Sequence, residues 1–254
     1  MTDTAGTSGE VARYYEEYWS QGGFAPERPL SAPFRELLER WTRAEDDCID
    51  IGCGTGEGVG EWLSAHANSY LGVDISQPAV ELATARGLNA RRVPDASDLG
   101  CPPRSFDFAV CFDVLEHLFS PQLVAAEVLR VLRPGGRLLI AVPNVAHWRR
   151  RLDLAVLGRW KPLGDDQSSL RPWRDPHIRF FAKRNLEPML EESGFADVEV
   201  GGLSGAFLSD LPVLRRLLRR DDVAGPISGR LVHAYPSLFG RSLFAIGTKP
   251  ADIG

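Results

Sequence analysis

The most informative segment of this 254-residue chain reads Cys48-Ile-Asp-Ile-Gly-Cys-Gly-Thr-Gly-Glu-Gly58. A short apolar run carries Asp50 near its end and leads into three glycines at alternate positions, Gly52, Gly54 and Gly56. Glycines so placed allow a tight turn with positive φ and let a ligand approach bare backbone. We therefore predict a strand over 48–52, a ligand-binding loop and a helix over 57–66, which together open a nucleotide-binding α/β fold.

The spacing after the loop narrows the type of nucleotide. A dinucleotide fingerprint, G-x-G-x-x-G, would place glycine where this chain has Glu57, and a carboxylate is unfavourable beside a pyrophosphate at a helix N-terminus. The next apolar run, Tyr70-Leu-Gly-Val-Asp-Ile75, carries Asp74 where it can accept both hydroxyls of a ribose. These residues favour an adenosine cofactor without a pyrophosphate over NAD or FAD. The alternative is a glycine-rich turn that binds nothing.

Composition bounds the class of protein. The formal net charge of −5 argues against a broad electrostatic contact with nucleic acid, and no apolar run is long enough to span a bilayer. The first ten residues are small, polar and acidic, unlike a signal peptide, and we expect them to be disordered. The cysteines have no metal-ligand spacing and suit a reducing cytoplasm; they are Cys48, Cys53, Cys101 and Cys111.

Apolar runs and amphipathic segments alternate along the chain. The apolar runs predict strands over 48–52, 69–74, 89–93, 106–111, 137–142, 196–202 and 241–248. The amphipathic segments predict helices over 33–43, 57–66, 77–86, 121–132 and 183–193. Such alternation implies a parallel sheet covered by helices on both faces, with ligands at the carboxyl ends of the strands.

Four motifs, in order along the chain, carry a resemblance to a known family. They are Asp50-x-Gly52-x-Gly54-x-Gly56, Asp74, Phe106-Asp-Phe-Ala-Val-Cys-Phe-Asp-Val-Leu-Glu-His117 and Leu132-Arg-Pro-Gly-Gly136. Over most of residues 10 to 200 the chain resembles the class I S-adenosylmethionine-dependent methyltransferases. The resemblance implies a Rossmann-like, doubly wound seven-stranded sheet, mostly parallel with an antiparallel last strand. It also implies S-adenosylmethionine as the cofactor, released as S-adenosylhomocysteine.

We predict one methyltransferase domain over residues 11–254, interrupted by insertions at about 143–181 and 204–240. The first insertion is rich in aromatic and basic side chains and lies where the resembled enzymes carry a substrate cap. The alternative is that these aromatic residues form an interface or the core of the cap. The second insertion contains a basic amphipathic helix over 211–220, which suits a solvated face or a dimer contact better than a membrane surface. A homodimer is therefore one of the arrangements that the sequence allows.

The resemblance assigns cofactor contacts residue by residue. Asp74 would bind the ribose and Asp95 the adenine amino group, with a solvated loop aspartate as the alternative for Asp95. A helix over 11–20 would close over the site, with Arg13 on the methionine carboxylate and Tyr14 or Tyr15 as a wall, or it would merely pack on the domain. The full set is Arg13, Tyr14, Asp50, Gly52, Cys53, Gly54, Gly56, Asp74, Ile75, Asp95, Ala96, Phe112, Asp113 and His117.

Methyl transfer to a hydroxyl requires a base that removes the hydroxyl proton, and histidine titrates near neutral pH. We rank His117 first as this base, then His147 and His177 in the cap. The alternative for His117 is a structural role, capping a helix or bonding to backbone. Asp113 and Glu116 could hold Mg²⁺ for a diol substrate, but they do not complete a ligand set, so we predict no metal site.

Closer resemblances suggest the class of acceptor. Val-Leu-Glu-His117 with Arg-Pro-Gly-Gly136 resembles the ubiquinone O-methyltransferases. The run from Pro143 to Leu152, with His177-Ile178, resembles the methionine-biosynthesis W protein group, which is associated with a homoserine acyltransferase. We expect a small-molecule O-methyltransferase, less so an N-methyltransferase, acting on a sugar or secondary metabolite. The alternatives are an accessory partner of a biosynthetic enzyme and, last, a nucleic-acid or protein methyltransferase.

Overall fold

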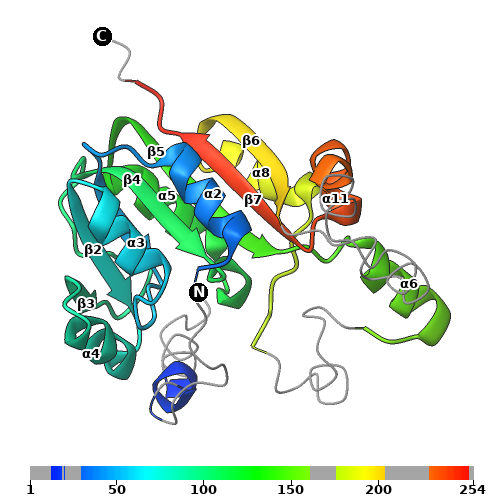
Figure 1. Ribbon diagram of the computed structural model, residues 1–254, viewed down its shortest axis with the longest axis horizontal. Coiled ribbons are helices and arrows are strands. Elements are labelled where there is room, and N and C mark those ends of the chain that lie inside the picture. Colours follow the sequence, from blue (N-terminus) through cyan, green and yellow to red (C-terminus); the bar gives the residue numbers. More distant parts are fainter. Residues whose placement is uncertain (1–12, 19, 21–29, 161–175, 204–228, 252–254) are drawn as a thin grey trace, which may run out of the picture.

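The computed structural model describes residues 13–18, 20, 30–160, 176–203 and 229–251 (Figure 1). The expected disordered N-terminus, the basic helix over 211–220 and parts of both predicted insertions lie outside these ranges. The described chain forms a sheet with helices on both sides, so the predicted α/β architecture is confirmed. Within these ranges no helix combines the length and the apolar character that crossing a membrane requires.

The sheet has seven strands in the order β3-β2-β1-β4-β5-β7-β6. The strands are β1 (Asp47–Ile51), β2 (Ser69–Asp74), β3 (Ala90–Arg92), β4 (Phe106–Phe112), β5 (Leu132–Pro143), β6 (Ala196–Leu203) and β7 (Ser242–Thr248). The first five strands pair in parallel, and β7 runs antiparallel to both β5 and β6. The expectation of a mostly parallel sheet with an antiparallel last strand is therefore confirmed.

The described helices lie on the two faces of the sheet or extend away from it (Figure 1). They are α2 (Ala32–Trp41), α3 (Val59–His66), α4 (Gln77–Ala85), α5 (Pro121–Val131), α6 (Trp148–Leu157), α8 (Lys183–Glu192) and α11 (Pro236–Phe239), with a short 3₁₀ turn η1 (Leu115–His117). α2 and α3 lie on one face, and α5 and α8 on the other (Figure 1). Residues of β1 alternate between these layers, because successive strand side chains point to opposite faces. Ile49 and Ile51 pack in the cluster of α5 and α8, whereas Cys48 packs in that of α2 and α3.

Two elements start two or more residues away from the sequence-based expectation. α3 begins at Val59 rather than near residue 57, because Gly58 has a φ of +76°, outside the right-handed helical range. β5 begins at Leu132, directly after α5, rather than at residue 137. Arg133-Pro-Gly-Gly136 forms a bulge within β5, since the pairing with β4 passes from Phe106–Leu132 to Phe108–Arg137. The N–H of Lys249 donates to the carbonyl of Gly136 at 2.8 Å, so the bulge stays paired on its other side.

The strand order reverses between β1 and β4, which are neighbours at the centre of the sheet. In open α/β sheets, ligands bind at the carboxyl ends of the strands beside such a reversal. The glycine loop follows β1, Asp74 ends β2, and residues 113–117 follow β4. The topology thus brings these three predicted segments to one edge of the sheet.

A buried ion pair joins the start of β1 to β5. The Nη2 atom of Arg137 lies 2.6 Å from both carboxylate oxygens of Asp46, and Nη1 donates to the carbonyl of Trp41 at 2.7 Å. Both charged side chains are buried, so each charge depends on the other for compensation. The pair therefore fixes the end of α2 against the middle of the sheet.

We expect Asp46→Ala to lower the free energy of unfolding by about 3–5 kcal/mol, because it leaves the Arg137 charge buried and unpaired. Urea unfolding followed by circular dichroism measures the change. The matched control is Glu199→Ala, which removes the exposed 3.3 Å pair with Arg40 and should cost less than about 1 kcal/mol. Losses of similar size in the two variants would contradict the prediction.

Candidate functional site

The loop after β1 is built so that only glycine fits at two of its positions. Gly52 and Gly56 have φ values of +73° and +72°. A Cβ on Gly52 would lie 2.3 Å from Cγ2 of Val114, and a Cβ on Gly56 would lie 2.1 Å from Cδ1 of Leu88. Because Val114 belongs to the segment after β4, the glycine loop packs directly against the neighbouring part of the candidate site. The predicted tight turn with positive φ is confirmed.

The carboxylate of Asp74 connects this loop to the next helix. Oδ2 accepts a hydrogen bond from the N–H of Gly54, and Oδ1 accepts one from the N–H of Ser76, both at 2.9 Å. Ser76 is the N-cap of α4, where its hydroxyl accepts from the N–H of Ala79. Burial raises the pKa of Asp74, whereas the backbone N–H donors act in the opposite direction. Asp74 therefore shapes the loop, a role that its predicted contact with ribose did not include.

Asp50 lies buried beneath the same loop. Its Oδ2 accepts a hydrogen bond from the hydroxyl of Tyr70 at 3.3 Å, and burial raises the pKa of Asp50 to about 7. The Tyr70 hydroxyl fits because Gly60 and Gly72 have no side chain: a Cβ on either would lie 2.6 Å from the hydroxyl oxygen. The sequence analysis missed Tyr70, and the available signal was a hydroxyl-bearing side chain two residues from Gly72 in the same strand.

Asp95 lies in the loop after β3 and is half-buried. Its Oδ1 accepts hydrogen bonds from both the backbone N–H and the hydroxyl of Ser97, each at 2.8 Å. Ala96, the next residue, packs against the apolar cluster under α5. These contacts hold the Asp95 carboxyl in one orientation at the sheet edge, and its role toward adenine stays a prediction.

The N-terminal helical residues 13–18 pack across this edge through Tyr15. The Tyr15 ring lies edge-on to the ring of His117, with 5.6 Å between centroids, and its carbonyl accepts from the hydroxyl of Ser76 at 3.5 Å. Arg13 and Tyr14 are exposed. Tyr15, one of the two tyrosines predicted to form a wall, contacts the segments after both β2 and β4.

A cluster of Glu116, His117 and His177 forms beside the glycine loop. Nε2 of His117 lies 4.0 Å, and Nε2 of His177 3.8 Å, from Oε1 of Glu116, and the two imidazole centroids are 4.2 Å apart. The segment that carries His177 is fixed by its backbone, because the N–H groups of Ile178 and Arg179 both donate to the carbonyl of Glu116, at 2.9 and 3.0 Å. Two of the three predicted base candidates therefore meet at one place.

The third candidate, His147, lies in a different turn. It is buried at the start of α6, and its backbone N–H donates to the carbonyl of Asn144. Asn144 is itself buried and organises this turn, since its side-chain amide donates to three carbonyls in and beside α11. The N–H of Val145 donates to the carbonyl of Phe181 at 3.0 Å, and Asn144 and Phe181 form a parallel bridge. The first predicted insertion, at about 143–181, therefore leaves the sheet and returns to it at the bridge between Asn144 and Phe181.

The two residues at the end of β4 occupy separate environments. Phe112 is half-buried, and its ring lies edge-on to Phe34 with 5.3 Å between centroids. Asp113 is exposed and has a φ of +53°, and its N–H donates to the carbonyl of Ala141 at 2.9 Å. The strained turn at Asp113 directs the chain from β4 into η1, which carries Glu116 and His117.

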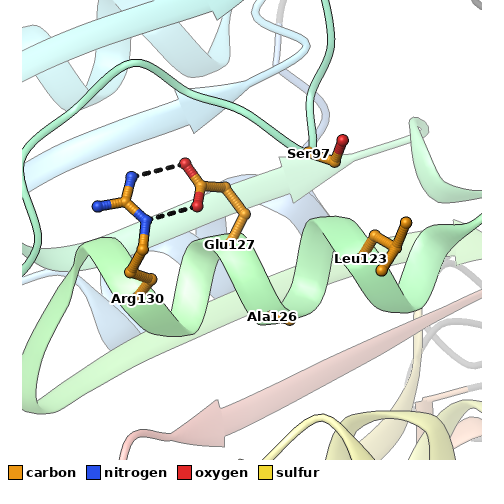
Figure 2. A pocket seen from close by; sticks show the side chains of 5 residues that line it. All are labelled: Ser97, Leu123, Ala126, Glu127 and Arg130. Carbon is orange, nitrogen blue, oxygen red and sulfur yellow. Dashed lines mark hydrogen bonds and ion pairs between the residues drawn. The ribbon is translucent and has the colours of Figure 1, made fainter. Parts of the chain in front are cut away.

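Figure 2 shows a shallow pocket elsewhere on the surface, lined by Ser97, Leu123, Ala126, Glu127 and Arg130. None of the predicted site residues lines it. Its charged groups bind each other, because the guanidinium of Arg130 contacts both carboxylate oxygens of Glu127 at 2.7 Å. The candidate functional site is therefore the edge formed by the carboxyl ends of the strands rather than this pocket.

Known proteins similar to this chain agree with that geometry. A methyltransferase domain model matches residues 22–200. A ubiquinone biosynthesis O-methyltransferase from Idiomarina loihiensis is 27% identical over 165 residues, which are 61% of this chain and 63% of the relative. A probable S-adenosylmethionine-dependent methyltransferase from Mycolicibacterium smegmatis is 32% identical over 199 residues, which are 77% of this chain and 66% of the relative. The matches thus span slightly less than two thirds of either relative's length.

A solved structure shows the same fold. A phosphoethanolamine N-methyltransferase 2 from Haemonchus contortus, determined in complex with S-adenosylmethionine, superposes with a TM-score of 0.61 at 19% identity, covering 97% of this chain and 58% of that one. The domain match covers most of the chain, and the glycine loop, the acidic end of β2 and the sheet order fit it. The chain therefore belongs to the methyltransferase domain family, and its fold and cofactor are those of a class I S-adenosylmethionine-dependent methyltransferase.

Proposed function

We propose that this methyltransferase moves the methyl group of S-adenosylmethionine to a hydroxyl oxygen of a small molecule. The observation that carries the proposal is the cluster of Glu116, His117 and His177 at the strand edge beside the glycine loop. A hydroxyl becomes a good nucleophile only when its proton is removed, and this cluster offers groups suited to that task near neutral pH. The relative from Idiomarina loihiensis, named an O-methyltransferase, supports oxygen as the acceptor atom.

In this proposal the cofactor lies along the carboxyl edge from β1 to β3. The backbone of the glycine loop contacts the cofactor closely. The Asp74 carboxylate, through its remaining lone pairs, accepts hydrogen bonds from the ribose hydroxyls. The Asp95 carboxylate accepts a hydrogen bond from the adenine amino group, and the hydrogen bond from Ser97 orients that carboxylate. Asp50 faces the cationic methionine end through the loop, and Tyr15 covers the site from the N-terminal helix.

The acceptor in this proposal is a sugar or a secondary metabolite. Supporting it is the described part of the first insertion, where α6 begins Trp148-Arg-Arg-Arg151 and has no buried residue. Several apolar side chains of α6 are exposed as well; they are Leu152, Leu154, Val156 and Leu157. In this proposal α6 meets the acceptor through its exposed apolar side chains, because the guanidinium groups of Arg150 and Arg151 donate to the carbonyls of Asn144 and Ala146. An accessory role without methyl transfer is the alternative that the experiments below decide.

We expect Asp74→Ala to abolish measurable binding of S-adenosylmethionine, because it removes both the ribose acceptor and the hydrogen bond that holds Gly54. Isothermal titration with S-adenosylmethionine and S-adenosylhomocysteine measures the affinity, and circular dichroism confirms that the variant is folded. Asp98→Ala, in the exposed loop after β3, is the control and should bind normally. A folded Asp74→Ala protein with unchanged affinity would refute the assignment.

We expect the affinity for S-adenosylmethionine to rise as pH rises through about 7. Burial raises the pKa of Asp50 to about 7, so the free protein is half protonated there. The cationic cofactor favours the carboxylate, which means that binding lowers this pKa and releases a proton. Titration calorimetry at pH 7 in buffers of different ionisation enthalpy detects that proton. Asp50→Asn should release none, and proton release retained in this variant would disprove the link.

We expect His117→Ala to bind the cofactor like the wild type but to turn over at least ~100-fold more slowly, the lower range for losing a group that handles a proton. Release of S-adenosylhomocysteine, measured with an acceptor found by screening hydroxylated metabolites, gives the rate. His233→Ala, which removes an exposed histidine, is the matched control. Wild-type turnover in the His117 variant would move the role to another residue.

A further inference from the structure

We propose that Glu116, His117 and His177 together bind one divalent transition-metal ion of the zinc type. This inference rests on the proposed function and deepens it, because it states how the acceptor hydroxyl is held and deprotonated. Within the part of the chain that the structure describes, these three residues form a group whose ligand atoms all lie within 4.8 Å of one another.

The distances fit a shared ion better than direct hydrogen bonds. Nε2 of His117 and Nε2 of His177 lie 4.0 and 3.8 Å from Oε1 of Glu116, which is beyond hydrogen-bonding range. Ligand atoms that sit ~2.0–2.2 Å from one metal ion are roughly 3–4 Å from each other. Small side-chain rotations therefore bring all three atoms onto one ion.

The carboxylate of Glu116 needs a positive partner. The side chain is 2% exposed, and neither of its oxygens has a hydrogen-bond partner in the described chain. A buried carboxylate without partners is strongly unfavourable, and a bound cation removes that penalty.

The histidines are oriented as metal ligands usually are. Nδ1 of His117 lies 3.3 Å from the carbonyl of Pro176, and a carbonyl can only accept, so Nδ1 carries the hydrogen. In the neutral ring Nε2 then presents its lone pair toward Glu116. A backbone carbonyl on the far nitrogen is a common support for metal-binding histidine. The strap formed by Ile178 and Arg179 fixes His177 on the other side.

Two histidines and one carboxylate form a ligand set of the catalytic type, which leaves a coordination position for water or substrate. The His117 and His177 side chains are 14% and 12% exposed, so one side of the cluster is accessible. Imidazole ligands favour zinc-type ions over Mg²⁺. The sequence analysis predicted no metal because His177 is distant in the chain from Glu116 and His117, so the spacing gave no signal.

The ion would act on the acceptor. A hydroxyl bound to it loses its proton to water more readily than a free hydroxyl does. The oxygen then attacks the methyl carbon of the sulfonium, forming an O–C bond as the C–S bond breaks and its electron pair stays on sulfur. The products are the methyl ether, S-adenosylhomocysteine and one released proton.

Direct metal titration tests the proposal. Chelator-treated protein is titrated with Co²⁺, followed by visible absorption, and with Zn²⁺ in competition with a chromophoric chelator. We expect one equivalent of tight binding in the wild type and in His233→Ala. Glu116→Gln and His177→Ala should weaken binding by more than the ~10–100-fold that losing an outer partner of a ligand costs. Circular dichroism verifies that each variant is folded.

The results separate this inference from the proposed function. Absence of stoichiometric metal binding, or binding unchanged in both folded variants, would overturn the metal site. Full methyl transfer by metal-free protein would also overturn it, while leaving the O-methyltransferase proposal intact. One bound metal ion that is lost in both variants supports the site even in protein that binds no S-adenosylmethionine, a result that would overturn the proposed function instead.

Discussion

The arrangement of the loops at the carboxyl ends of the strands depends on one carboxylate. Asp74 ends β2, and its two oxygens accept N–H groups from Gly54 on one side and Ser76 on the other. These hydrogen bonds join the loop after β1 to the N-terminus of α4. The connection from β1 to β2 and the connection from β2 to β3 are therefore both held by the Asp74 carboxylate. Because the loop also packs its bare Gly52 against Val114, the segment after β4 is positioned by the same arrangement. A single acidic side chain thus helps to order the loops after β1, β2 and β4, which carry the predicted site residues.

Much of the fold could be predicted from the sequence, because its determinants are local. Alternating apolar and amphipathic runs gave all seven strands, with β2 correct at both ends, and the glycine spacing located the loop with positive φ. The two misplaced starts have different causes. The positive φ of Gly58 delays the start of α3, which is a local effect, whereas pairing with Lys249 carries β5 through Arg133 to Gly136. Only the second depends on a partner distant in the sequence.

The candidate site was less predictable for the same reason. Residues within a motif, such as Asp50, Asp74 and His117, could be named because the motif fixes their place on a strand end. Contacts between motifs could not be, since they depend on side-chain packing in three dimensions. Tyr70 under the glycine loop and the approach of His177 to Glu116 belong to this second class. Tyr15 lies between the two classes, since a wall formed by Tyr14 or Tyr15 was predicted but its contact with His117 was not.

The bridge between Asn144 and Phe181 ties together the two ends of the stretch between them. This stretch leaves and returns at one point of the sheet edge, and its return passes through the strap that is bonded to the Glu116 carbonyl. Because the entropy cost of a closed loop grows only slowly with its length, a change in the number of residues between α6 and Pro176 would displace neither end. The strap would then still hold His177 beside Glu116.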